Sequence, residues 1–105
     1  MREVVVKTFE VAWEVATGYP PGTHWKVLHR ENEGEPSTIL LKLAPGFEMP
    51  AHSHMYVEHH YVLGGEYESQ GKRFPAGTYR VIPKHVDHGP FRSANGAELL
   101  VMWGD

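Results

Sequence analysis

Glycine and proline divide this chain into short segments, and this limits its fold more than any other feature. Eleven Gly and eight Pro are spread over 105 residues, and the runs between them are rich in Val, Ile, Leu, Tyr and Trp. Short β-prone runs separated by turn signals are typical of an all-β sandwich or barrel. One or two helical turns over Glu10–Ala16 are the only helix that we expect.

Six segments have the composition of strands. In one of them Ile39, Leu41 and Leu43 alternate with Thr38, Leu40 and Lys42, and this period of two places alternate side chains on opposite faces of a sheet. The predicted strands are Arg2–Lys7, Trp25–His29, Thr38–Leu43, Met55–Leu63, Thr78–Ile82 and Glu98–Trp103.

Composition excludes several classes of function. The net charge is −3 and the ten basic residues are scattered, which argues against nucleic acid as a partner. The absence of cysteine excludes disulfides, iron–sulfur clusters and cysteine nucleophiles. No run reaches the ~18 apolar residues of a membrane span, and the first seven residues are too short and charged for a secretory signal. We expect one domain over residues 1–105, not bound to membranes and cytoplasmic by default.

A cluster of histidines is the strongest functional signal. Six of the eight histidines fall between positions 52 and 88. His52 and His54 are two residues apart and share a face on an extended strand, and Glu58 lies an even number further on. Two imidazoles and a carboxylate resemble the facial triad of non-haem iron sites. A fourth ligand could come from His85 or His88, and an isolated His-x-His has ordinary surface explanations.

The spacing around this cluster resembles the two motifs of the cupin superfamily. Eight motif positions match in order within about residues 38–103. The sequence departs from the usual second motif at two positions, where His85 replaces Gly and Arg92 replaces Asn. The matching patterns are Gly46-x5-His52-x-His54-x3-Glu58-x6-Gly65 and Gly77-x5-Pro83-x-His85-x2-His88.

A narrower resemblance is to the ChrR-like cupin group. That group includes the cupin half of zinc-dependent anti-sigma factors, which carry an additional helical domain, and small carbonyl-cleaving dioxygenases. The resemblance implies a jelly-roll β-barrel with His52, His54, Glu58 and His88 as ligands of one divalent transition metal. The segments that carry it are residues 38–46, Pro50-x-His52-x-His54, Tyr61-Val62-Leu63-x-Gly65 and Pro75-Ala76-Gly77-Thr78-Tyr79.

These ligand types do not determine which metal binds or which reaction is catalysed. Iron, zinc, manganese, nickel and copper all accept imidazole and carboxylate. An octahedral ion with four protein ligands keeps two open positions, enough for a small-molecule substrate and dioxygen. We therefore favour a dioxygenase-type enzyme acting on a small carbonyl or aromatic compound. The alternatives are a non-catalytic cupin that senses or binds a metal or ligand, and a metal-assisted isomerase or lyase.

Several residues near the predicted ligands have both a candidate functional role and an ordinary structural one. By strand parity His60 points inward with Glu58 and His59 points outward, so His60 is the candidate catalytic residue, as a hydrogen-bond donor behind the ligands or a proton carrier. It could also simply pack in the barrel, or replace Glu58 as a ligand. We interpret His85 as a turn residue and Arg80 as a solvated surface residue. Candidate pocket walls are Phe47, Met49, Met55, Tyr56, Tyr79 and Phe91.

The chain is also predicted to form a homodimer. The runs Val4-Val5-Val6 and Leu99-Leu100-Val101, with Trp103, offer more apolar surface than a lone barrel exposes. Pairing of sheet edges between two copies protects a terminal strand from aggregation, and cupins of similar size commonly pair in this way.

Overall fold

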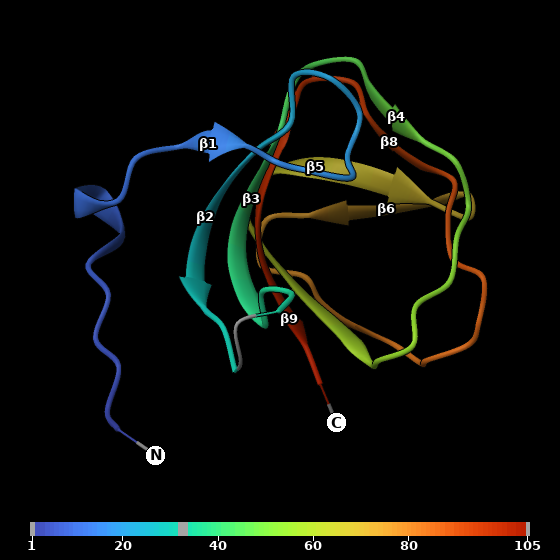
Figure 1. Cartoon of the computed structure of the whole chain (residues 1–105). Coiled ribbons are helices and arrows are strands. Elements are labelled where there is room, and N and C mark those ends of the chain that lie inside the picture. The colour runs from blue at the N-terminus through green and yellow to red at the C-terminus, as the bar shows by residue number, and fades with distance from the viewer. Residues whose placement is uncertain (1, 32–33, 105) are drawn as a thin grey trace.

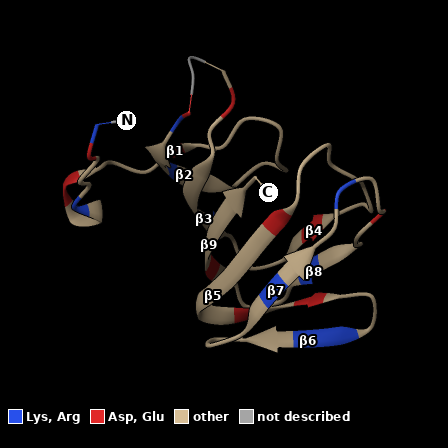
Figure 2. Ribbon diagram, turned by 90° about the horizontal axis from the view of Figure 1, so that it is seen from below, with Lys and Arg blue, Asp and Glu red and all other residues tan. Residues whose placement is uncertain are grey.

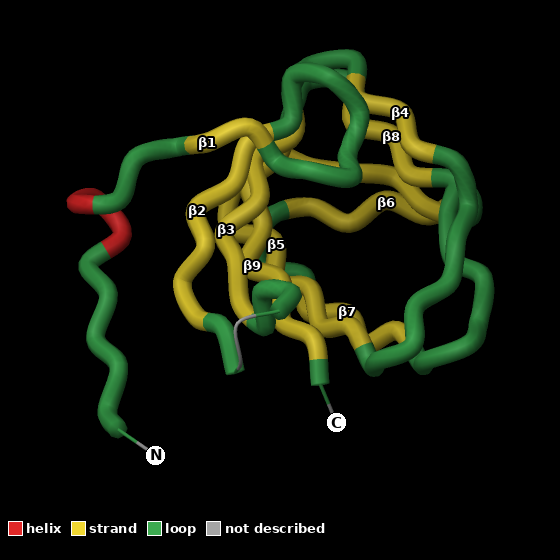
Figure 3. Tube along the Cα trace, in the orientation of Figure 1, coloured by secondary structure: helices red, strands yellow, loops and turns green. Residues whose placement is uncertain are grey.

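The computed structural model describes residues 2–31 and 34–104 and places nine strands in one curled sheet (Figures 1 and 3). The strand order is β1-β2-β3-β9-β5-β8-β4, and β6 and β7 also pair with β5. The sheet curls around an interior, and the predicted all-β barrel fold is confirmed. The elements are η1 (Thr8–Glu10), β1 (Glu14–Val15), β2 (His24–His29), β3 (Thr38–Leu43), β4 (Phe47–Met49), β5 (Glu58–Ser69), β6 (Lys72–Pro75), β7 (Tyr79–Ile82), β8 (Phe91–Ser93) and β9 (Ala97–Trp103).

The long strand β5 joins the two halves of the barrel. Its first residues pair with β7 and β9, and its last residues pair with β6 and β8. Between these parts the register with β9 shifts from Val62 to Gly64. At Gly65, where φ is +70°, a Cβ would lie 2.3 Å from the carbonyl oxygen of Gly96. Only glycine fits this close approach, so the strand can bend here and carry the sheet around the barrel.

The core fills the inside of this curled sheet. Ile39, Leu41 and Leu43 are buried while Lys42 is exposed, which confirms the period-two alternation predicted for β3. The other inward apolar side chains come from several strands and from the segment before β2, so that residues far apart in sequence form one cluster. They include Ala16, Trp25, Phe47, Val62, Tyr67, Phe91, Ala97, Leu99 and Val101.

The N-terminal predictions are wrong. Residues 2–7 form no strand, and Val4 and Val5 are 53% and 74% exposed. This segment lies beside the barrel and has no paired neighbour in the described chain, so its Val-rich composition alone does not make a strand (Figure 1). Among the described residues only η1 is helical. Of the helical turns expected over Glu10–Ala16, only Glu10 lies in η1, whereas residues 14 and 15 form β1 and residues 11–13 and 16 are neither helix nor strand.

Strand β9 is central rather than terminal in the sheet. It lies between β3 and β5, and Leu99 and Val101 are 2% and 1% exposed. The expectation that these residues present apolar surface to a second copy is therefore wrong. Alternation places them on the inner face of the strand, where they pack in the core.

Loops position the functional end of the molecule. The segment between β1 and β2 crosses one opening of the barrel, while the β4–β5 and β7–β8 loops run side by side (Figure 1).

Basic residues lie on several elements, among them β6 and β7 (Figure 2). Within the described residues, no helix has the length and apolar character needed to cross a bilayer.

Candidate metal centre

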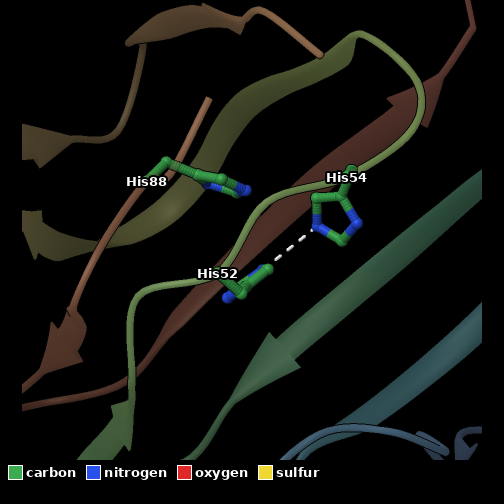
Figure 4. Close-up of side chains that lie close together, drawn as sticks. All are labelled: His52, His54 and His88. Carbon is green, nitrogen blue, oxygen red and sulfur yellow. Dashed lines mark hydrogen bonds between the residues drawn. The ribbon is translucent and has the colours of Figure 1, made fainter. Parts of the chain in front are cut away.

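Three histidines converge between two loops (Figure 4). His52 and His54 come from the β4–β5 loop, and His88 comes from the β7–β8 loop. One ring nitrogen of each lies within 4.8 Å of those of the other two. The fold therefore brings together three of the residues that the sequence singled out, and this group could hold a metal ion.

Backbone hydrogen bonds fix the two loops to each other. The His52 N–H donates to the His88 carbonyl over 3.0 Å, and the His88 N–H donates to the His52 carbonyl over 2.8 Å. A third bond of 2.8 Å runs from the His85 N–H to the His54 carbonyl. The two-residue spacing works as predicted, with Ser53 exposed between two half-buried histidines. However, these residues lie in a loop, because the strand expected from Met55 begins only at Glu58.

The surroundings of His88 fit a metal ligand. Its side chain is 2% exposed, and neither ring nitrogen has a hydrogen-bond partner. A buried nitrogen without a partner is costly, and a metal ion would provide a partner for one of the two. Burial lowers the pKa of His88 to about 4, an effect that the neighbouring histidines reinforce and the charge of Glu58 opposes. The ring is therefore neutral at physiological pH, as coordination requires.

The separation of His52 and His54 also fits a shared ion. Their Nε2 atoms lie 3.0 Å apart. Two imidazoles bound to one ion at about 2.1 Å and at right angles would place their nitrogens roughly 3 Å apart. The same separation serves a hydrogen bond if one of the two nitrogens carries a proton.

Glu58 begins β5 on its inner face and is 4% exposed. Its Oε1 lies 3.0 Å from Nε2 of His54 and accepts from the Trp103 indole N–H, and its Oε2 lies 2.6 Å from Nε2 of His60. Burial by itself raises the pKa of this carboxyl, but the hydrogen bonds from His54 and His60 outweigh it and hold the pKa well below its usual range. Glu58 is not in the group of three within 4.8 Å, so its role as fourth ligand stays a prediction.

His60 points inward and is 6% exposed, as strand parity predicts. Both of its ring nitrogens are engaged, Nε2 with Glu58 and Nδ1 with the Tyr67 hydroxyl at 2.7 Å. No ring nitrogen is left for an ion, which disfavours the alternative in which His60 replaces Glu58. Packing in the barrel, the other alternative, agrees with the burial of His60, but both ring nitrogens bond side chains and neither bonds a backbone carbonyl.

Two further histidines lie away from the group. His59 is on the outer face of β5, where its Nδ1 lies 2.7 Å from the Tyr79 hydroxyl. His85 is exposed, with a φ of +62° in the turn after Pro83. The interpretation of His85 as a turn residue is confirmed.

A small apolar cavity, about 30 Å³ in volume, lies beside Glu58 and His52. Of the predicted wall residues, Phe47, Met49 and Phe91 line it. Met55, Tyr56 and Tyr79 do not, since they are 75%, 61% and 56% exposed. The prediction missed several lining residues from other segments, namely Tyr19, Leu41, Leu43, Tyr67 and Leu99.

Two of the lining residues that the sequence did not reveal are tyrosines. Strand parity counted from Glu58 places Tyr67 outside, but the register shift near Gly64 turns it inward. Tyr19 reaches the cavity from the loop that crosses the barrel, where burial, then the charge of Glu58, raises its pKa. Arg80 was expected in solvent, yet its guanidinium lies over the rings of Phe74 and Phe91, 4.7 and 5.7 Å from their centroids.

Solved structures share this fold. An RmlC-like cupin from Shewanella frigidimarina is 24% identical, with a TM-score of 0.75 over 97% of this chain and 90% of that one. A candidate acetylacetone dioxygenase from Methylibium petroleiphilum is 19% identical, with a TM-score of 0.85 over 98% of this chain and 77% of that one.

A third similar structure is the Rhodobacter sphaeroides complex of SigE with the anti-sigma factor ChrR. The matched chain of that complex is 24% identical to this one, with a TM-score of 0.69. The match covers 94% of this chain and 52% of the matched chain. Curated protein sequences give no match. The family model of the ChrR cupin-like domain matches residues 1–104. Together with the barrel and its histidines, this match shows that the chain belongs to the ChrR cupin-like family.

Proposed function

We propose that this protein is a metal-dependent cupin enzyme of dioxygenase type, acting on a small carbonyl or aromatic compound. His52, His54, Glu58 and His88 would hold one divalent ion. An iron(II) ion held there would supply a centre at which dioxygen and an enolisable substrate can react. The likeness in fold to a candidate acetylacetone dioxygenase supports this class of reaction.

The apolar cavity beside the proposed ligands is the observation that carries the proposal. A site that serves only to stabilise the fold normally has all of its metal positions closed by protein. Here Glu58 and His52 border a space lined mostly by apolar side chains. Apolar walls with a few polar groups are the usual surroundings of a small organic ligand. The cavity holds about one or two waters by volume, so a substrate would require side chains to move.

The polar groups of the cavity have distinct roles in this proposal. Glu58 is ionised at neutral pH because of its depressed pKa, so it can balance positive charge. His60 faces the cavity and bonds Glu58 directly, which supports a role for this side chain in holding or passing a proton next to the substrate.

An oxygen-electrode screen tests the reaction. Iron-, zinc- and manganese-loaded protein would be compared on a panel of β-diketones and hydroxylated aryl ketones. We expect oxygen uptake by the iron form only, loss of uptake in Glu58→Ala, and in His60→Ala a larger loss of turnover than of metal binding. Substrate conversion without oxygen uptake would instead indicate an isomerase or lyase. Elemental analysis of protein purified without added metal identifies the resident ion.

Acid should release the metal steeply. Three imidazole ligands must each be neutral to coordinate, and the reference pKa of histidine is about 6.5. We expect metal content to fall as the pH is lowered toward about 5. Equilibrium dialysis against zinc across this range measures the effect, and an occupancy independent of pH would contradict a site built from histidines.

A sensing or binding role is the second candidate. The family match and the likeness to the ChrR complex with a sigma factor favour it. In that case the protein would bind zinc tightly and the iron form would consume no oxygen with any compound of the panel. The same screen therefore separates the two functions.

We also propose a homodimer, with different contact residues from those expected at first. Val4 and Val5 are exposed as required, but Leu99 and Val101 are buried. The outer faces of β5 and β7 expose apolar side chains in their place, namely Tyr61, Leu63, Tyr79 and Val81. Light scattering that gives the mass of one chain at micromolar concentration would contradict this proposal.

A further inference from the structure

A line of hydrogen-bonded side chains leads from the proposed ligand Glu58 toward the surface. Its Oε2 lies 2.6 Å from Nε2 of His60, and Nδ1 of His60 lies 2.7 Å from the Tyr67 hydroxyl. Nη1 of Arg80 donates to the same hydroxyl over 3.4 Å. We propose that Arg80, Tyr67 and His60 are positioning residues that form a one-way chain of donors, which fixes the tautomer of His60 and the orientation of the Glu58 carboxylate.

The direction of the chain follows from what each group can donate. The Glu58 carboxylate is an acceptor only, so Nε2 of His60 carries a proton and donates to it. In the neutral ring Nδ1 then has no proton and accepts from the Tyr67 hydroxyl. A guanidinium has donors only, so Arg80 donates to the lone pair that remains on the Tyr67 oxygen. Burial raises the pKa of Tyr67 despite the nearby charge of Arg80, so the phenol keeps the proton that the chain needs.

Packing holds each member in place. Tyr67 is 1% exposed and its ring lies against Phe74 and Phe91, with centroids 5.2 and 5.9 Å away. The Arg80 guanidinium lies over the same two rings. One aromatic pair thus positions the first two donors together, and neither can turn away without losing its contacts with these rings.

The series of donors Arg80, Tyr67 and His60 determines which oxygen of Glu58 remains available to other partners. Oε2 is occupied by His60, whereas Oε1 faces His54. If Glu58 is a metal ligand, as the proposed function requires, His60 orients it from behind. Hydrogen bonds of this kind to a ligand are typically worth 10–100-fold in metal affinity.

The outer face of β5 provides a matched control. His59 and Tyr79 form the same type of contact, from Nδ1 to the hydroxyl over 2.7 Å, but His59 is half-buried and Tyr79 exposed. Tyr79→Phe removes a hydroxyl from a His–Tyr pair without touching Glu58. Any effect seen in Tyr67→Phe and absent in Tyr79→Phe therefore belongs to the inner chain.

Nitrogen-15 NMR of the histidine rings tests the tautomer directly. In zinc-loaded and in metal-free protein, we expect Nδ1 of His60 to resonate as an unprotonated nitrogen and Nε2 as a protonated one. Tyr67→Phe should broaden or shift this pattern and lower zinc affinity by roughly 10–100-fold. Tyr79→Phe should leave both unchanged, and Arg80→Gln should give a smaller change in the same direction as Tyr67→Phe.

A protonated Nδ1 in wild-type protein would overturn the proposal without the use of any variant. So would a Tyr67→Phe protein with unchanged zinc affinity and an unchanged His60 spectrum. The metal-free measurement separates this inference from the proposed function. If the tautomer is as predicted but no metal binds, the donor chain stands and the metal-dependent function fails.

Discussion

The two faces of β5 carry the same pair of side chains in opposite environments. On the inner face His60 bonds Tyr67, and on the outer face His59 bonds Tyr79, with 2.7 Å between Nδ1 and the hydroxyl oxygen in each pair. The inner pair is buried and continues to Glu58. In the outer pair Tyr79 is 56% exposed, and the pair ends at the surface. The same His–Tyr hydrogen bond therefore does not by itself indicate a functional role. The position of the pair relative to the three converging histidines distinguishes the two cases.

The largest effect should come from removing an inward ligand. His88→Ala should lower metal affinity by more than the roughly 10–100-fold caused by loss of a group behind the ligands. His52→Ala, His54→Ala and Glu58→Ala should do the same, whereas His59→Ala should bind metal normally. Metal content after dialysis measures this. Full occupancy in His88→Ala together with loss in His85→Ala would show that the second motif is assigned wrongly.

Removal of the ion should destabilise the whole barrel. A ligand that binds only the folded state at about 1,000 times its Kd stabilises it by about 4 kcal/mol. We therefore expect a clear drop in Tm when chelator is added at pH 7.5. The His59→Ala variant should show the same drop, and His88→Ala should show almost none. Equal Tm values with and without chelator in wild-type protein would mean that the ion contributes little to the fold.

Loss of one hydroxyl should separate the two His–Tyr pairs. Tyr67→Phe leaves a buried ring nitrogen of His60 without a partner, which costs about 1–3 kcal/mol. Tyr79→Phe removes an exposed contact and should change stability by no more than about 0.5 kcal/mol. Urea unfolding of both metal-free variants gives the comparison, and equal losses would refute the distinction between the faces.

High pH should produce the smallest of these changes in stability, and the change should come from the buried tyrosines on the inner side of the sheet. Burial raises the pKa of Tyr67 and of Tyr19 above the ordinary value near 10. Above pH 10 the unfolded chain therefore releases protons that the folded chain retains, and stability falls as the pH rises. The slope of this fall should be shallower in Tyr67→Phe than in wild-type protein. Urea midpoints between pH 9 and 11 measure it, and equal slopes in the two proteins would contradict the prediction.

Local patterns in the sequence predicted much of the fold and three residues of the site. The alternation in Thr38–Leu43 gave the bounds of β3 correctly, because one face of that strand is buried along its whole length. Residue spacing predicted that His52 and His54 converge, and the resemblance to the second cupin motif selected His88 rather than His85. The inward position of His60 followed from parity over the two residues after Glu58, where the strand is still regular.

What the sequence missed depends on long-range geometry. Tyr67 faces the cavity only because the register shift near Gly64 reverses parity. Tyr19 reaches it from the loop between β1 and β2, which is distant in sequence from the other residues of the cavity. The failed strand Arg2–Lys7 shows the opposite case, in which strand-like residues have no neighbour to pair with. Local composition carries no information on any of these three.

The reciprocal backbone bonds between His52 and His88 have a consequence for how the chain is held closed. They join segments that are far apart in the sequence, at the point where the three imidazoles meet. An ion at this point would act as a reversible cross-link across the loop between these residues, in a chain that has no cysteine. Such a link restricts the unfolded ensemble much as a disulfide does, but it opens with acid or chelator rather than with a reductant.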